Sequence, residues 1–319
     1  MHPAYSVIFF TTASGLGYGM LILLGVMGAA GLIAADRAFA VAAFGLAFTA
    51  VTLGLFASTL HLGHPERAWR AFSQWRSSWL SREGVAAVAT YLPTGLFALG
   101  WVIWQETGGG FALAGVAGAV GALATVYCTG MIYASLPTIS AWSNRWTVPG
   151  YLVLALATGS LWLAALARLF DVAHPAITHL PIGLVLAAWI VKAAYWRSLD
   201  NAPRASTRQT ATGLGGEGVP VRFLFSPHSQ DNFVMREMGY RIARKHAVPL
   251  RRTAQALAFG VPLVLTDLDM FWPDGPAALL TGLAVLSACV GTAGVALERW
   301  LFFAEARHVV TLYYEPRGQ

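Results

Sequence analysis

Residues 61–83 read HLGHPERAWRAFSQWRSSWLSRE and separate two long apolar segments. These 23 residues hold two histidines, two acids, four arginines and three tryptophans. The flanking runs, 38–65 and 84–105, contain no Asp, Glu, Lys or Arg. A helix that spans a membrane needs about 20 apolar residues. Residues 61–83 are therefore predicted to connect two membrane spans on one side of the bilayer.

The rest of the chain repeats this pattern. Hydrophobic residues make up 56% of it and charged residues 11%, whereas a soluble domain carries about 25% charged residues. Since a backbone in lipid must satisfy its own hydrogen bonds, we predict an all-α, polytopic membrane protein. All 319 residues are assigned to a single integral membrane domain. Eight transmembrane helices are expected, at about 6–34, 39–61, 83–104, 111–133, 148–168, 177–196, 253–268 and 277–303.

Three details accompany these helices. Gly15 and Gly19 have the GxxxG spacing that lets membrane helices approach closely. Lys192 lies near a predicted helix end, where its long side chain is expected to extend outward to the interface. The run at 253–266 is short, so its crossing depends on Asp267 and Asp269 reaching the far interface.

The basic residues are distributed unevenly between the two sides. With eight spans, 18 of the 21 Lys and Arg residues fall on the side of both termini. The positive-inside rule then places the termini and residues 61–83 in the cytoplasm, with the chain in the inner (cytoplasmic) membrane.

The long polar segment 197–252 is a predicted cytoplasmic loop. Its later part, DNFVMREMGYRIARKHA, has helical spacing and ends in a basic cluster. Loops this long in a compact protein often have a function, so we predict a docking surface for a soluble partner, with a solvated loop as the alternative. The expected charge contacts are Arg236, Arg241, Arg244 and Lys245.

A quinone pocket is the chemistry that residues 61–83 suggest. His61 is the last residue of one predicted helix and Glu83 is the first residue of the next, on the same side of the membrane. Such groups can hydrogen-bond a carbonyl oxygen or exchange a proton. The alternative for His61 is a residue that binds only the last carbonyls of its helix. The alternative for Glu83 is an acid near a helix N-terminus, with Ser81 as N-cap, that the helix dipole favours. The apolar spacing over 65–80 also predicts an amphipathic helix in the headgroup region. Further residues assigned to the pocket or its entrance are His64, Trp69, Arg70, Trp79 and Arg82.

No metal or haem site is predicted in this chain. Cys128 and Cys289 lie singly inside predicted spans, which excludes an iron–sulfur or zinc site built by this chain alone. Haem in a membrane bundle is held between histidines of facing helices, but the histidines here fall at span ends, in loops or in tails: His2, His61, His64, His174, His179, His228, His246 and His308.

Three segments resemble the membrane-anchor subunits of the DMSO reductase family of molybdoenzyme complexes. They are residues 61–83, MIYASLPTISAWSNRWTVP, and STRQTATGLG followed by DNFVMREMGYRIARKHA. Within that family the chain is most similar to the anchors of cytoplasmic sulfite-oxidising enzymes. The resemblance implies eight helices, no haem, and quinone-site roles for the residues that match here as His61 and Glu83.

The resemblance also implies partners and a direction of electron flow. Molybdopterin and iron–sulfur clusters would reside only in a catalytic subunit and an iron–sulfur subunit docked on the side of the termini. The expected function is transfer of electrons from the iron–sulfur subunit to ubiquinone or menaquinone during sulfite oxidation. Two alternatives are a quinol-oxidising anchor of a DMSO-type reductase and a small-solute transporter. Nucleic acid is excluded as a partner because the charge borders spans rather than forming a separate domain.

Overall fold

The computed structural model describes residues 3–60, 62–202, 206–214, 221, 242–272 and 275–313. The secondary structure in these ranges is helical, which confirms the predicted all-α fold. The long helices are α1 (Tyr5–Ala29), α2 (Arg37–Thr59), α3 (Trp79–Leu99) with η2 (Gly100–Trp104), α4 (Gly109–Ala134), α5 (Thr147–Leu169), α7 (Leu180–Asn201) and α13 (Ala277–Ala304). Shorter elements are η1 (Pro65–Gln74), α6 (Pro175–Thr178), α8 (Arg208–Thr212), α10 (Ile242–Lys245), α11 (Ala247–Gln255), η3 (Ala256–Gly260), α12 (Val261–Phe271) and η4 (Val309–Tyr313).

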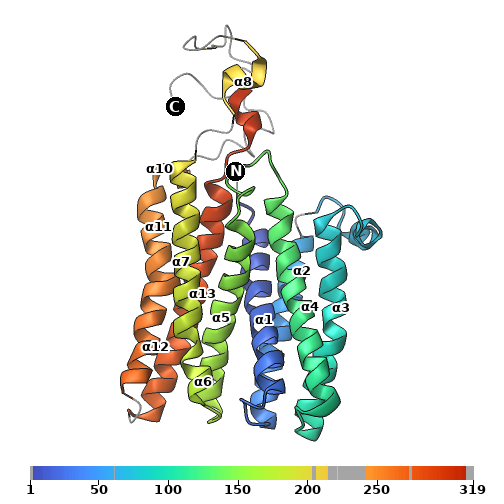
Figure 1. Ribbon diagram of the computed structural model, residues 1–319, viewed down its shortest axis with the longest axis vertical. Helices are drawn as coiled ribbons and strands as arrows, with labels where there is room; N and C mark the ends of the chain where they lie inside the picture. The colour runs from blue at the N-terminus through green and yellow to red at the C-terminus, as the bar shows by residue number, and fades with distance from the viewer. Residues whose placement is uncertain are drawn as a thin grey trace.

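Seven helices in the described ranges are long and apolar enough to cross a membrane. Their bounds are Tyr5–Ala29, Arg37–Thr59, Trp79–Trp104, Gly109–Ala134, Thr147–Leu169, Pro175–Asn201 and Ala277–Ala304. The expected helix at 253–268 lies in α11, η3 and α12, which follow one another and run beside α7 and α13 (Figure 1). These three elements are not among the seven, so an eighth crossing stays a prediction.

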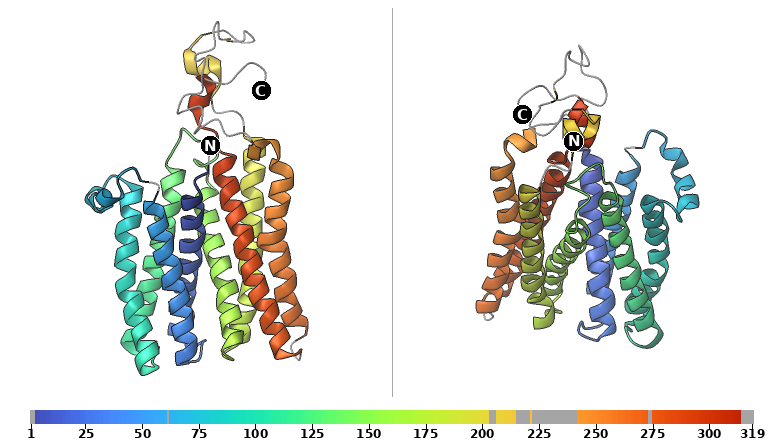
Figure 2. Two further views of the ribbon diagram at one scale, coloured as in Figure 1. Left: turned by 180° about the vertical axis from the view of Figure 1, so that it is seen from behind. Right: turned by 45° about the horizontal axis from the view of Figure 1, so that its top comes forward.

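Helix α1 lies at the centre of the bundle. In its most apolar stretch 78% of the residues are buried, the highest value among the seven candidate spans. It packs against α2, α4 and α5, while α3 covers α4 on one side and α7 and α13 cover α5 on the other (Figures 1 and 2). Helices α1 and α5 therefore join the two halves of the bundle.

Several functional candidates gather at one end of the bundle. Helix α1 begins there, α13 ends there, and η1 and α8 lie at the same end, the upper end in Figure 1. The connections that follow α1, η2 and α5 lie at the opposite end. The upper end is thus the one that carries residues 62–83 and the described parts of 197–252.

Helices α1 and α5 touch at glycines. A Cβ on Gly19 would lie 1.8 Å from the Ala155 carbonyl oxygen, and one on Gly159 would lie 2.4 Å from the Gly19 carbonyl carbon. These distances confirm the predicted close approach at Gly19. At Gly15 a Cβ would meet Ala155 at 3.9 Å, an ordinary contact. Only the second glycine of the GxxxG pair is therefore required by packing.

Replacing Gly19 by alanine is expected to destabilise the purified protein. The added methyl group meets backbone atoms of α5, which cannot rotate away, and overpacking of this kind typically costs about 1–3 kcal/mol. Gly15→Ala is the matched control, one turn away on the same helix, and should melt close to the wild type. The measurement is thermal unfolding in detergent. Equal melting temperatures for the two variants would contradict this account of the interface.

Candidate functional site

Glu83 is a buried acid inside α3. The helix begins at Trp79, and the side chain of Ser78 caps it by accepting a hydrogen bond from the Ser81 backbone N–H at 3.4 Å. The predicted helix start at residue 83 and the predicted N-cap Ser81 were therefore wrong. Glu83 lies one turn further in, with 4% of its surface exposed. Its position is explained less well by the helix dipole, which acts mainly on the first turn.

Thr129 of α4 is the hydrogen-bond partner of Glu83. Its hydroxyl is within hydrogen-bonding distance of a Glu83 carboxyl oxygen and also lies 3.1 Å from the Thr125 carbonyl oxygen. A threonine hydroxyl has one proton to donate. Both contacts are satisfied at once when the Glu83 carboxyl is protonated and donates to Thr129. The geometry thus suits a carboxylic acid that can release a proton.

The polar residues before α3 are exposed. The 65–80 region, predicted as one amphipathic helix, forms the 3-10 helix η1 over Pro65–Gln74 and then the start of α3, and no residue of η1 is buried. His64 is exposed and lies 3.1 Å from Glu66. Trp69 and Arg70 pair with each other, with the guanidinium carbon 5.6 Å from the ring centre. His61, the other predicted quinone ligand, lies outside the described residues.

Trp79 and Arg82 lie on the turn of α3 beside Glu83. The Arg82 guanidinium carbon is 4.2 Å from the centre of the Trp79 ring, and that ring meets Tyr127 of α4 edge-on. Arg82 also donates to the backbone carbonyls of Trp75 at 2.9 Å and Arg76 at 2.7 Å. These contacts fix the connection after η1 against the start of α3. Of the residues assigned to the pocket entrance, these two are nearest to Glu83 along the helix.

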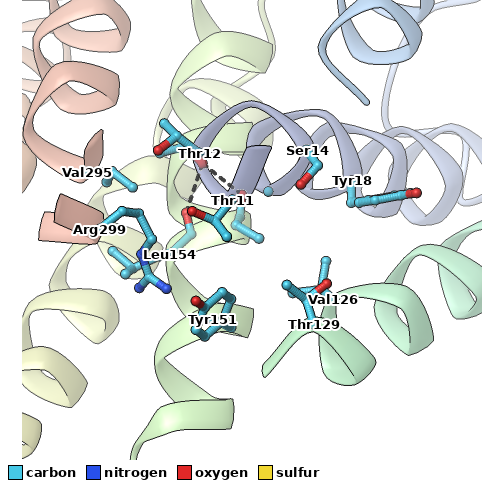
Figure 3. A pocket seen from close by; sticks show the side chains of 13 residues that line it. Thr11, Thr12, Ser14, Tyr18, Val126, Thr129, Tyr151, Leu154, Val295 and Arg299 are labelled. Carbon is cyan, nitrogen blue, oxygen red and sulfur yellow. Dashed lines mark hydrogen bonds between the residues drawn. The ribbon is translucent and has the colours of Figure 1, made fainter. Parts of the chain in front are cut away.

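A polar pocket lies beyond Thr129, between α1, α4, α5 and α13 (Figure 3). The space open to the centres of water molecules is about 20 Å³, enough for one or two waters. Its lining is rich in hydroxyl groups and includes one guanidinium. The lining residues are Thr11, Thr12, Ser14, Gly15, Tyr18, Val126, Thr129, Tyr151, Leu154, Ala155, Thr158, Val295 and Arg299.

Four buried donors of this lining make no hydrogen bond of acceptable geometry to the described residues. They are the hydroxyls of Thr12, Tyr18 and Tyr151 and one terminal nitrogen of Arg299. The Arg299 guanidinium carbon lies 4.1 Å from the centre of the Tyr151 ring. Buried polar groups are rarely left without a partner because desolvation is costly. The pocket therefore suits a polar occupant such as water.

A buried ionic cluster adjoins the pocket through Arg299. Glu298 accepts a hydrogen bond from the Arg299 side chain at 2.6 Å and forms an ion pair with Lys192 of α7. All three residues are at most 3% exposed. The expectation that Lys192 extends outward was wrong, because its ammonium group points at a carboxylate between α7 and α13. Helix α13 also continues past the apolar run, so Glu298 and Arg299 lie within it.

Residues 1–212 match the family model described as the DMSO reductase anchor subunit (DmsC). This chain belongs to that family of membrane anchors. It is also 33% identical over 336 aligned positions to a sulfite dehydrogenase subunit of Allochromatium vinosum, and the alignment covers 99% of both chains. The family resemblance found in the sequence is thereby confirmed. The chain is a multi-pass membrane anchor subunit of a molybdoenzyme oxidoreductase complex.

The family match covers part of the polar system in this anchor. Glu83, Thr129 and Lys192 lie within residues 1–212, whereas Glu298 and Arg299 lie beyond them. The cluster thus joins a helix inside the matched region to α13 outside it. The alignment with the Allochromatium protein extends over both parts.

Among the predicted docking residues of the anchor, the structure describes two. Lys245 is exposed on α10, and Arg244 beside it is half-buried. Helix α10 packs against α11 and α13 at the upper end. Arg236 and Arg241 lie outside the described residues, so the docking surface stays a prediction.

Sequence reasoning missed Thr129, Tyr151, Glu298 and Arg299. For Thr129 and Tyr151 the sequence offers no signal, because hydroxyl residues are common in membrane helices and often bond their own backbone. For the ionic cluster the sequence does offer a signal, because a charged residue within a membrane span is expected to face the bundle interior and to have a partner. Lys192 and Glu298 are such a pair, one from each of two long helices.

Proposed function

We propose that this anchor passes electrons from an iron–sulfur partner subunit to membrane quinone during sulfite oxidation. Two observations outside the site support this function: membership of the anchor family and full-length similarity to a sulfite dehydrogenase subunit. The observation within the site that carries it is Glu83, a buried acid hydrogen-bonded to Thr129 near one end of the bundle. Such a group has the chemistry needed to deliver a proton to a reduced quinone.

The quinone is proposed to bind beside His61 and Glu83, with Trp79 and Arg82 at the entrance. Reduction of one quinone to quinol takes two electrons from the partner and two protons from water. His61 is assigned to hydrogen-bond one quinone oxygen. Glu83 is assigned to give a proton to a quinone oxygen twice in each turnover and to be protonated again after each transfer.

The site and the partner are proposed to lie on the same side, the cytoplasmic side. Electrons cannot cross a hydrocarbon core about 30 Å thick without a carrier, and we propose that this anchor holds no haem. The described histidines, His64, His174, His179, His246 and His308, lie at helix ends or in connections. Glu83, α8 and the described end of 197–252 share the upper end of the bundle, which supports docking of the iron–sulfur and molybdopterin subunits there.

A quinol-oxidising anchor of a DMSO-type reductase is the second candidate, and the description of the matching family favours it. The same residues would then work in reverse, with Glu83 accepting a proton from quinol. The Allochromatium relative favours the sulfite-oxidising direction. The two candidates share the anchor role and differ in the partner that binds the substrate.

Purification of the intact complex through a tag on this anchor tests the assignment. Sulfite is expected to reduce added quinone in the presence of the complex, and a sulfoxide is not expected to oxidise quinol. The control is the same preparation from cells that lack the anchor. Turnover with the sulfoxide and none with sulfite would replace the first candidate by the second.

A further inference from the structure

A buried Glu83 needs a route for protons. With 4% of its surface exposed, the side chain has little direct access to water. Each quinol formed nevertheless consumes two protons, so a proton lost from Glu83 has to be replaced through the protein. Thr129 connects Glu83 to the polar pocket, because it bonds Glu83 and also lines the pocket.

The pocket has the properties of a short water-filled link. Its open space accommodates one or two water molecules. Thr12, Tyr18 and Tyr151, whose buried hydroxyls make no hydrogen bond of acceptable geometry to the described residues, are among the residues that line it (Figure 3). Water bound by such groups can donate and accept at the same time, which a chain of proton transfers requires. The space is too small for a quinone ring, so water is the occupant that we infer.

The far wall of the pocket is ionisable. Arg299 lines the pocket and bonds Glu298, and Glu298 pairs with Lys192. Aromatic rings pack against the two cations of this cluster: Lys192 lies 3.7 Å from the ring centre of Tyr195 on the same helix, and Arg299 lies over Tyr151 of α5. A carboxylate held between two cations in such surroundings is rare in a membrane span and is commonly part of a pathway for ions or protons.

The cluster also lies near the upper end of the bundle. Asp200 follows Lys192 on α7, and Glu305 follows Arg299 directly after α13. Arg251 binds both carboxylates, at 2.9 Å to Asp200 and 2.7 Å to Glu305. The side chain of Asp200 is 61% exposed. Trp196 separates this surface group from the cluster, because its ring faces both the Lys192 ammonium, at 4.8 Å, and the Arg251 guanidinium, at 5.8 Å.

We propose that the Lys192–Glu298–Arg299 cluster and the water in the polar pocket form the route by which protons reach Glu83 from the upper end. The inference rests on the proposed function. In each step Glu83 gives its proton to a quinone oxygen, and the carboxylate takes a proton from pocket water through Thr129. Glu298 does not line the pocket itself, so it passes its proton to the water held at Arg299, whose side chain bonds Glu298 and lines the pocket. Glu298 takes a proton from Lys192 in turn, and Lys192 recovers one from the aqueous side. Arg299 keeps its charge throughout and holds the Glu298 carboxylate through its hydrogen bond.

The test uses the intact complex and the variants Glu298→Gln and Tyr151→Phe. Turnover with sulfite and quinone is expected to fall about tenfold or more in Glu298→Gln, since a positioned proton donor typically contributes at least that much. A smaller fall is expected in Tyr151→Phe. The KM for quinone should stay at the wild-type value. Added acetate, a small weak acid that can enter polar cavities, should partly restore the rate in both variants.

Ser160→Ala is the matched control for the hydroxyl change. Ser160 is buried on α5 like Tyr151, but its hydroxyl donates to the Ala157 carbonyl at 2.8 Å and does not line the pocket. It should leave turnover unchanged. If Glu298→Gln fails to assemble, then Tyr151→Phe and Thr12→Val, which change no charge, decide the question.

Two results would overturn the route. Wild-type turnover in both Glu298→Gln and Tyr151→Phe would show that protons travel elsewhere. A raised KM with normal turnover at saturating quinone would show that the pocket receives the quinone itself. Failure of the route is distinct from failure of the proposed function, because the latter appears as wild-type quinone reduction in Glu83→Gln.

Discussion

Glu83→Gln is expected to slow electron transfer from sulfite to quinone by about 10²-fold, within the range that a general acid contributes. The glutamine side chain can keep the hydrogen bond with Thr129, because its amide both donates and accepts. It cannot release a proton, so the fold should persist while proton delivery fails. The measurement is sulfite-dependent reduction of quinone by the purified complex. Sulfite oxidation with an artificial soluble acceptor should remain near the wild-type rate.

His61→Ala is expected to act at the same step, through loss of a hydrogen bond to a quinone oxygen. Its effect should appear mainly as a raised KM for quinone, whereas Glu83→Gln should lower kcat. The matched controls are Glu66→Gln, an exposed acid on η1, and His174→Ala, an exposed histidine at the opposite end. If both site variants reduce quinone at the normal rate, the pocket is elsewhere and residues 61–83 serve only as an anchor.

The fold was largely predictable because lipid allows few structures. Charge-free runs indicated the all-α class and the approximate position of the long helices, since an apolar run of sufficient length must satisfy its own backbone hydrogen bonds. Helix ends were harder to predict. Helix α3 begins four residues before Glu83, because a helix can continue through charged residues when tertiary contacts or the interface provide partners. The ends of α13, by contrast, lie within one residue of the prediction.

The candidate site was predictable only in part. Glu83 stood out as an acid beside a span, but its burial depends on how α3 packs on α4, which periodicity alone does not give. Lys192 was misplaced for the same reason. A lysine two turns from a helix end can reach water, unless a neighbouring helix offers a carboxylate, and here Glu298 does. Long-range pairing of this kind becomes visible only in three dimensions.

The arrangement connects the docking and chemical proposals. Lys245 on α10 is exposed at the upper end, where α10 packs on α11 and α13. Helix α13 carries Glu298 and Arg299 at the same end. A partner docked over α10 would therefore lie above the side of the bundle that holds the ionic cluster, whereas α3, which carries Glu83, lies on the other side of α1.

Deletion of residues 222–246 is expected to release the soluble subunits from the membrane. This segment contains the basic residues assigned to docking, and its loss should remove most of the interface on the upper end. Because α10 packs on α11 and α13, a second deletion limited to 222–241 separates loss of docking from damage to the bundle. The measurement is the amount of soluble subunits that copurify with the tagged anchor, normalised to anchor in the membrane.

Charge reversal gives the sharper version of the same test. Arg236, Arg241 and Lys245 changed together to glutamate should weaken copurification strongly, although each exposed pair alone contributes only about 0–1 kcal/mol. The weakening should grow with ionic strength, because salt screens the charges that remain. Arg37→Glu, at the opposite end of the bundle, is the control and should leave copurification unchanged. If the soluble subunits stay bound to the 222–241 deletion and to the charge-reversed anchor alike, the segment is a solvated loop, and docking must rely on residues 62–83 and the end of α13.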